Sequence, residues 1–336
     1  MSDPASRRQA ILEFWTWWDD HRDEVLERIQ GGRDSGFVGP LSDRVKAIHE
    51  DLQWELGRGD AKDHHLCVTG AGDPRLRVLA EHWRAAGPDD PDFEFHCARQ
   101  RSPSGALTIE IGEVVANLED FALEVEADDT HQVFHLTAWH PAFEALDEGA
   151  RQTILFLALD QALGEDAVET WLGRLDFSET APSAATSVSM SELWTLVERA
   201  SERWPEPMWV LGEGEDEATG GQIIYLVCTS AKYLLEPLFD TVCVARLPYD
   251  TDDSGMPVTD EEKARVDAFE DEVIALLGDA VRSLCRSTGA GERRYWLYLQ
   301  AENGPARATL DRLAAESARP VELRFAWDPG WRELPT

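Results

Sequence analysis

Hydrophobic and polar residues alternate along the chain with both helical and strand spacing, which predicts a mixed α and β protein. Phe14, Trp18, Val25 and Ile29 recur at helical spacing until Gly31 ends the pattern, so the first helix is expected over 7–30. Further helices are predicted at 42–49, 73–86, 150–164, 189–204, 259–277 and 305–317. Strands are predicted at 52–57, 64–69, 92–97, 107–111, 121–126, 131–139, 207–212, 222–228, 240–247, 281–287, 293–300 and 320–326, and 168–177 is expected to run through a short helix into a further strand.

Polar breaks divide this pattern into two or three small α+β units. Residues 1–100 form an N-terminal unit, and 101–180 form a middle unit that is either separate from the first or continuous with it. The segment 181–191 contains a proline and many small polar residues, which is typical of a linker. Residues 192–336 then form a C-terminal domain.

The C-terminal domain has the most explicit order of elements. From residue 240 the order is β-α-β-β-α-β, which is typical of a ferredoxin-like fold with an antiparallel sheet and two helices on one face. In the helix predicted at 259–277, Val266, Phe269, Val273 and Leu277 form one apolar stripe. We expect this stripe to face the sheet.

Charge narrows the classes of partner. The chain holds 31 Lys and Arg against 65 Asp and Glu among 336 residues, so its formal net charge is −34. Because a protein that binds nucleic acid needs a basic surface, nucleic acid is not an expected partner. A protein partner is expected instead, and a basic one would be attracted most strongly.

Cysteine use and hydropathy indicate the compartment. The five cysteines are widely spaced and lie mostly in apolar runs, which is typical of reduced core thiols and of the cytoplasm. The longest apolar run, 154–159, is too short to cross a membrane, so no membrane association is expected.

Several short stretches of the C-terminal domain resemble the bacterial family catalogued as domain of unknown function 695. The resemblance covers 245–334. It implies a distant similarity in fold to the B-type regulator of ribonuclease E activity, a small acidic protein that works by binding an enzyme. It implies no catalytic residue. The stretches are Asp253 to Pro257, Glu261 and Glu262, Phe269 to Asp271, Leu276 and Leu277, Thr288 to Arg293, Tyr295 to Leu299, and Trp327 to Trp331.

All nine histidines lie in the first 140 residues, which raises the question of a metal site. His65 and Cys67 share one face of a predicted strand, and His131 and His135 share one face of another. No local metal-binding motif accompanies them. Partly buried structural side chains explain them better, and we expect neither a metal nor another cofactor.

The segment 69–75 joins a strand to a helix through a glycine-rich turn. Such a turn can hold an anion at the helix N-terminus, and Arg75 and Arg77 lie nearby. Asp73, however, is a typical N-cap residue that would occupy the same amide groups. A tight, capped turn is the favoured interpretation.

Asp160 is a second ambiguous residue, because it lies inside the apolar helix 150–164. A carboxylate there costs several kcal/mol unless it is paired or exposed. It is therefore either a partnered structural charge, which we favour, or part of a site.

One strand of the C-terminal domain offers candidate binding residues. In 293–300, Arg294, Trp296 and Tyr298 share one face, and Tyr295, Leu297 and Leu299 share the other. If helices cover the leucine face, the Arg294, Trp296 and Tyr298 face is free for a partner or packs on a neighbouring unit.

These observations favour an acidic, non-catalytic protein that binds and regulates a protein partner in the manner of an inhibitor. No catalytic residue is assigned. The alternative is a hydrolytic or metal-dependent enzyme, with a site assembled from histidines, cysteines and carboxylates of the N-terminal half.

Overall fold

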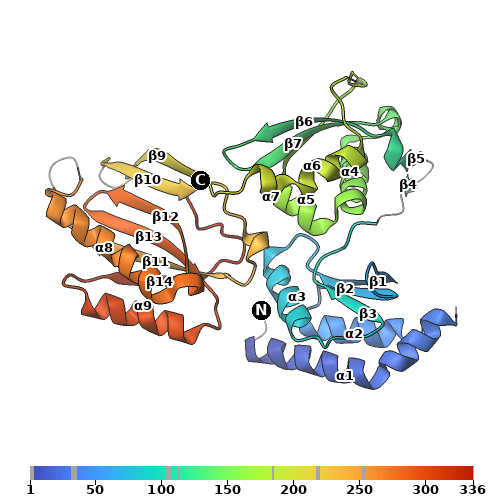
Figure 1. Cartoon of the computed structure of the whole chain (residues 1–336), viewed down its shortest axis with the longest axis horizontal. Helices are drawn as coiled ribbons and strands as arrows, with labels where there is room; N and C mark the ends of the chain where they lie inside the picture. Colours follow the sequence, from blue (N-terminus) through green and yellow to red (C-terminus); the bar gives the residue numbers. More distant parts are fainter. Residues whose placement is uncertain are drawn as a thin grey trace. The chain divides into compact units, whose positions relative to one another are not determined.

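The computed structural model describes residues 4–31, 36–102, 108–111, 114–183, 185–216, 220–251 and 255–335, and it has an α+β fold (Figure 1). The chain forms two compact units. Unit 1 comprises Met1–Ala127 and Val133–Ala200, and unit 2 comprises Asp128–Gln132 and Ser201–Thr336.

The first part of unit 1 packs three helices on one face of a three-stranded sheet. Strand β2 pairs with β1 antiparallel and with β3 parallel. The core between helices and sheet includes Phe14, Trp18, Leu66, Trp83 and Phe93. The elements are α1 (Pro4–Gln30), α2 (Val38–Ile48), β1 (Gln53–Arg58), β2 (His64–Thr69), α3 (Pro74–Ala85) and β3 (Phe93–His96).

The second part of unit 1 is built around another small sheet, in which two strands, a helical segment and a third strand follow one another as β1, β2, α3 and β3 do. The sheet order is β6-β7-β8, and β7 pairs with β8 in parallel, as β2 does with β3. A separate antiparallel pair, β4 with β5, precedes it. The elements are β4 (Thr108–Ile111), β5 (Val114–Asn117), η1 (Leu118–Asp120), β6 (Ala122–Asp128), β7 (Val133–Trp139), η2 (Pro141–Ala145), α4 (Glu148–Leu163), α5 (Glu165–Trp171), β8 (Leu172–Phe177) and α6 (Met190–Glu198).

Two sequence-based boundaries differ from the structure around this part. The expected linker 181–191 is attached to unit 1, because Val188 forms an antiparallel bridge with Leu123 of β6. Unit 1 continues to Ala200, so the main part of unit 2 begins at Ser201 rather than at residue 192, and unit 2 also includes Asp128–Gln132. Strand β5 was not predicted. Parts of the expected polar break at 101–105 and of the strand at 107–111 lie outside the described residues, as do Asp253 and Ser254.

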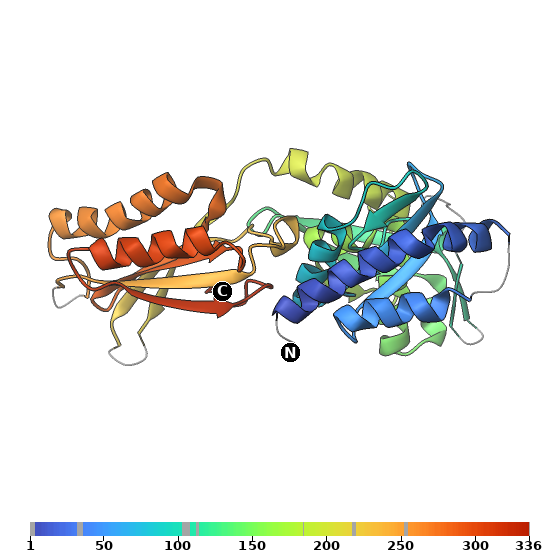
Figure 2. The same cartoon turned by 90° about the horizontal axis from the view of Figure 1, so that it is seen from below.

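Unit 2 is built on one six-stranded sheet. The strand order is β14-β11-β13-β12-β10-β9, and every neighbouring pair is antiparallel. Helices α8 and α9 lie on the same side of this sheet (Figure 2). The elements are α7 (Ala200–Arg203), β9 (Trp209–Glu215), β10 (Gln222–Cys228), η3 (Tyr233–Leu235), β11 (Thr241–Pro248), α8 (Asp260–Leu277), η4 (Gly278–Ala280), β12 (Arg282–Gly289), β13 (Glu292–Leu299), α9 (Gly304–Glu316) and β14 (Glu322–Trp327).

The apolar stripe predicted on α8 faces the sheet. Val266, Phe269 and Val273 are buried, and Leu277 packs partly against the same core. The strand side of this core includes Tyr295 and Leu297 of β13. The helix starts as its sequence predicts, because Thr259 accepts a hydrogen bond from the backbone N–H of Glu262.

The opposite face of β13 is not open. Trp296 is 7% exposed and Tyr298 is fully buried, and both pack in a second core with Phe239 and Trp331 of the same unit. The Tyr298 hydroxyl donates a 2.6 Å hydrogen bond to Asp328. The segment after β14 folds back over this face, which the strand alternation alone does not reveal. The expectation of a free face is therefore wrong for Trp296 and Tyr298.

Candidate functional site

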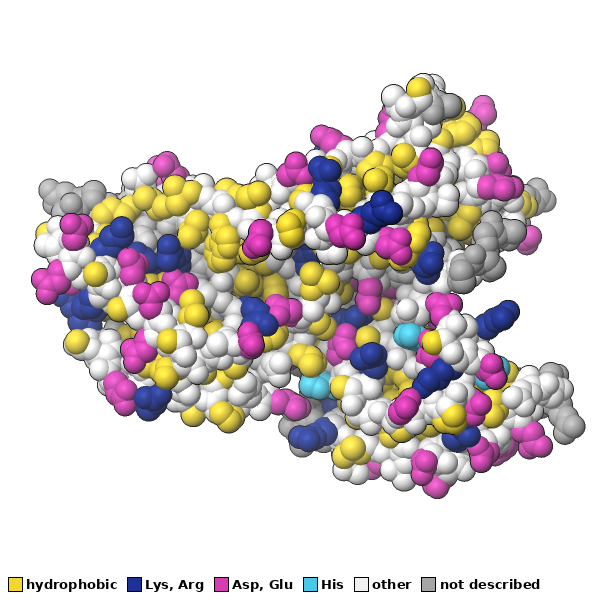
Figure 3. Space-filling model, viewed as in Figure 1, with side chains coloured by type: hydrophobic (Ala, Val, Ile, Leu, Met, Phe, Trp, Pro, Cys, Tyr) yellow, Lys and Arg dark blue, Asp and Glu magenta, His cyan; other side chains and the backbone are white. Residues whose placement is uncertain are grey.

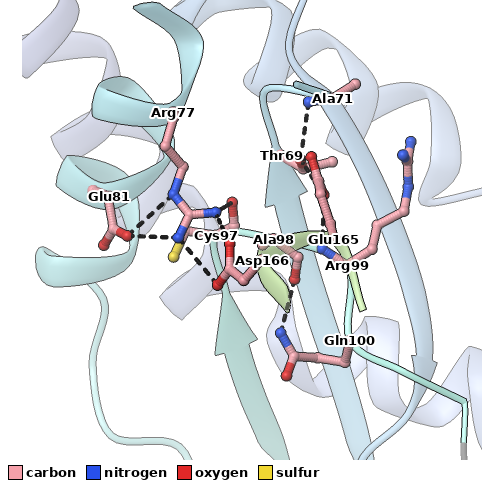
Figure 4. Close-up of polar contacts among 10 residues, drawn as sticks. All are labelled: Thr69, Ala71, Arg77, Glu81, Cys97, Ala98, Arg99, Gln100, Glu165 and Asp166. Carbon is pink, nitrogen blue, oxygen red and sulfur yellow. Dashed lines mark hydrogen bonds and ion pairs between the residues drawn. The ribbon is translucent and has the colours of Figure 1, made fainter. Parts of the chain in front are cut away.

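A set of polar residues connects the two parts of unit 1, and we call this set the polar junction; Thr69, Arg77 and Glu165 are its buried members. It consists of Thr69 at the end of β2, Arg77 on α3, Arg99 after β3, and Glu165 and Asp166 at the start of α5 (Figure 4). Thr69 is the last residue of β2 and Glu165 is the first residue of α5, so the ends of these two elements fix the centre of the set. Nearly a hundred residues separate its two sides in the sequence.

Glu165 is the centre of the polar junction. Its side chain is only 6% exposed, and both of its carboxylate oxygens lie 2.7 Å from the Thr69 hydroxyl, which donates to them. The backbone N–H of Arg99 donates a further hydrogen bond of 2.9 Å. A buried carboxylate requires such donors, because an unpaired one would lose its hydration without compensation.

Arg77 pairs with carboxylates in the part of the polar junction next to Glu165. This buried guanidinium lies 2.5 Å from Asp166 and 3.0 Å from Glu81, which is one turn further along α3. It also donates to the backbone carbonyl of Cys97. The two carboxylates provide the charge that a buried arginine needs, so α3 and α5 are tied through opposite charges.

Two further carboxyls beside Glu165 have unusual pKa values. Burial raises the pKa of Asp160 to about 6, and repulsion by Glu165 adds to this effect. Burial, followed by repulsion from the charge of Glu165, likewise raises the pKa of Glu169 to about 7. Asp160 forms no side-chain hydrogen bond or ion pair within the described part of the chain, and only the charge of Arg99 partly opposes the rise of its pKa. Carboxyls that titrate near neutral pH can exchange protons under physiological conditions.

Histidines and carboxylates also meet on the β1–β3 sheet. The His65 imidazole lies 3.7 Å from Glu55, and its interaction with that carboxylate raises the pKa of His65. His96 lies 3.2 Å from Glu94, but burial lowers the pKa of His96. The two imidazole rings stand 5.9 Å apart, between their centroids. The sequence placed His65 on a strand, but it gave no sign that His96 lies beside it.

The other candidates for metal binding lie elsewhere. His131 is in the turn before β7 rather than on the strand, and it contacts Asp128 at 2.7 Å. His135 accepts a hydrogen bond from the backbone N–H of Arg174. Cys67 is buried, which raises the pKa of its thiol. Within the described ranges, no three His, Cys, Asp or Glu side chains are grouped as a metal site would require.

The glycine-rich turn at 69–75 has the capped structure that we favoured. Asp73 accepts hydrogen bonds from the backbone N–H of Arg75 and from its side chain. Gly72 has a φ of +84° and lies against Glu169, since a side chain built there would stand 3.4 Å from that carboxylate. The carboxylate of Asp73 thus occupies the amide that an anion would need.

Most of the negative charge of the protein is displayed at the surface. Figure 3 shows acidic side chains scattered over the visible face of both units, among Lys and Arg, rather than gathered in one patch. Among the described residues, the buried carboxylates are Asp90, Glu165, Asp240 and Asp328. The excess of Asp and Glu is therefore available to an external partner.

Comparisons with known proteins add no functional assignment. A scan against protein-family models and a search of curated proteins both give no match for this chain. In the part of the chain that the structure describes, no helix is long and apolar enough to cross a membrane.

Sequence reasoning missed most of the polar junction. The run Glu165, Asp166 and Glu169 is visible as three carboxylates in one short helix after Gly164, which is a usable signal. No local pattern reveals that Thr69 donates to Glu165. Of the three residues predicted to bind a partner, Arg294 alone has a substantially exposed side chain, at 33%, and it pairs with Glu292. Their binding role stays a prediction.

Proposed function

We propose that this protein is a non-catalytic regulator that binds a basic protein partner through electrostatic attraction. One observation carries the proposal: a net charge of −34 combined with a fold that buries few of its carboxylates. Surface charge of one sign raises the rate of encounter with an oppositely charged protein. The exposed Asp and Glu side chains would supply that attraction.

We also propose that unit 2 is an extended ferredoxin-like domain. The order β14-β11-β13-β12, with α8 and α9 on one face, supports this assignment, and β10 and β9 would be additions at one edge. Membership of the family catalogued as domain of unknown function 695 is part of the same proposal. So is a cytoplasmic location, which the five buried, unpaired cysteines support.

The test is affinity capture on the full-length chain at two salt concentrations. Proteins retained from a native lysate at about 0.1 M salt should be basic and should be released at about 1 M, because the screening length falls from about 10 Å to about 3 Å. A matched column carrying a variant with exposed carboxylates changed to amides should retain less. Retention that is independent of salt, or no enrichment of basic proteins, would contradict the proposal.

A second candidate is an acid–base enzyme centred on the polar junction. Asp160 and Glu169, with pKa values of about 6 and 7, are the observation that favours it. A metal-dependent enzyme would instead use the histidines and carboxylates of the β1–β3 sheet, and it is tested by elemental analysis of the purified full chain. A stoichiometric metal that is lost in His65→Ala would support this enzyme, and a metal-free protein would contradict it.

A further inference from the structure

Strand β9 is one of the two outer strands of the sheet in unit 2, the other being β14, and it has one neighbour, β10, among the described strands. The backbone N–H of Thr229 donates to the carbonyl of Met208, and that of Asp216 donates to Gly221. Both ends of the hairpin therefore place even-numbered residues of β9 toward β10. Because the direction alternates along a strand, the N–H and C=O groups of Trp209, Leu211, Glu213 and Glu215 point outward.

This outer edge lacks most of the usual forms of protection, apart from the charges of Glu213 and Glu215. Proteins commonly shield an edge strand with charged side chains, especially lysine, or with proline, a bulge or a covering segment. The sequence WVLGEGE of β9 has neither lysine nor proline, and the pairing with β10 is regular over seven residues. Within the described residues no hydrogen bond reaches the outward backbone groups of β9.

The side chains of β9 define what would fit beside it. Trp209 is 42% exposed and Leu211 is 67% exposed, and they share one face with the exposed Glu213 and Glu215. On the other face, the alternate positions Gly212 and Gly214 carry no side chains and lie against Tyr225 of β10. One face of the edge thus changes from apolar to acidic along the strand.

We propose that the β9 edge binds an extended, basic peptide segment of the partner, which pairs with it as an additional antiparallel strand. From its N-terminus, this segment would place basic residues opposite Glu215 and Glu213 and then apolar residues opposite Leu211 and Trp209. A second copy of this chain would instead bring two bodies of charge −34 together. The inference rests on the proposed function, because it names the surface and the chemistry of that same partner.

The test uses the full-length chain and a synthetic peptide. In this peptide two lysines and then two valines occupy alternate positions, with threonine between them. The control peptide carries glutamates in place of the lysines. Fluorescence anisotropy at low salt should show binding of the lysine peptide and at least about tenfold weaker binding of the glutamate peptide. Equal binding of the two peptides would overturn the proposal.

Two variants separate the backbone from the side chains of the edge. Leu211→Pro removes an outward N–H and leaves the pairing with β10 in place, so it should weaken peptide binding by at least about tenfold. Leu211→Ser keeps the N–H and should weaken binding less. Hydrogen exchange of β10 and β12 checks that both variants are folded. If Leu211→Pro disturbs the sheet, the double variant Glu213→Lys, Glu215→Lys tests the proposal instead. It should also weaken binding of the lysine peptide by at least about tenfold.

The outcomes distinguish this inference from the proposed function. If Leu211→Pro binds the peptide as tightly as the original chain does, the edge is not the binding surface. If Leu211→Pro still retains basic proteins from the lysate in a salt-dependent way, the proposed function stands, but the inference about β9 fails. If Leu211→Pro loses both the peptide and the basic proteins of the lysate, the result supports both the proposed function and the inference about β9.

Discussion

Asp160→Asn should stabilise unit 1 at neutral and alkaline pH. The carboxyl of Asp160 has a pKa of about 6 in the folded chain against an ordinary value of 3.8, because burial and the charge of Glu165 disfavour its ionised form. The raised pKa means that the folded state binds this proton more tightly than the unfolded state does. Stability from this group is therefore full below about pH 4 and is lost as the pH rises through about 6. The uncharged amide avoids that loss.

The expected gain follows from the same pKa values. At about 1.36 kcal/mol per pH unit, the change from 3.8 to about 6 corresponds to about 3 kcal/mol, an upper bound because Asp160 is partly exposed. We expect a gain of ~1–3 kcal/mol at pH 8 and almost none at pH 4. The assay is urea unfolding of the full chain, read by hydrogen exchange of α4 at each urea concentration. Asp20→Asn, on the exposed face of α1, is the matched control. An Asp160→Asn gain that is the same at pH 8 and pH 4, or a destabilisation at pH 8, would refute the reasoning.

Three further substitutions test the packing, each by urea unfolding of the full chain. Phe269→Ala should destabilise unit 2 by ~3–5 kcal/mol, because it removes a large buried side chain. A loss of stability no larger than that from replacing an exposed residue with alanine would contradict the place of Phe269 in the core. Thr69→Val should cost ~1–3 kcal/mol, because buried Glu165 loses its hydroxyl donor; an unchanged midpoint would show that the hydrogen bond contributes nothing. Tyr298→Phe should cost ~1.5–3 kcal/mol through the lost bond to Asp328, and a neutral result would argue against that buried contact.

Local patterns were sufficient for most elements of the fold. The stripe of Val266, Phe269 and Val273 determined which side of α8 meets the sheet, since the alternation in β13 presents a matching apolar face. Asp73 and Thr259 marked helix starts, because an N-cap needs only its own neighbouring amides. Such features depend on residues a few positions apart, which a sequence displays directly.

The candidate site depended on contacts that no local pattern contains. The hydrogen bond from Thr69 to Glu165 joins residues 96 positions apart, and only the packing of α5 near the end of β2 brings them together. Trp331 caused the main error in unit 2. It returns to cover Tyr298, so alternation along β13 identified two faces correctly but could not show what lies on the second.

Unit 2 is discontinuous in the sequence, and this affects how fragments of the protein should be cloned. The turn Asp128–Gln132 belongs to it, although β6 and β7 on either side are strands of unit 1. Thr229 donates to the carbonyl of Thr130, and Gln132 donates to that of Glu206. An expression vector encoding 201–336 alone would omit this turn. The Thr229 hydroxyl and the Glu206 carbonyl would then lose these partners and bind water instead. A peptide spanning the turn, supplied separately, would then be the natural complement for reconstitution.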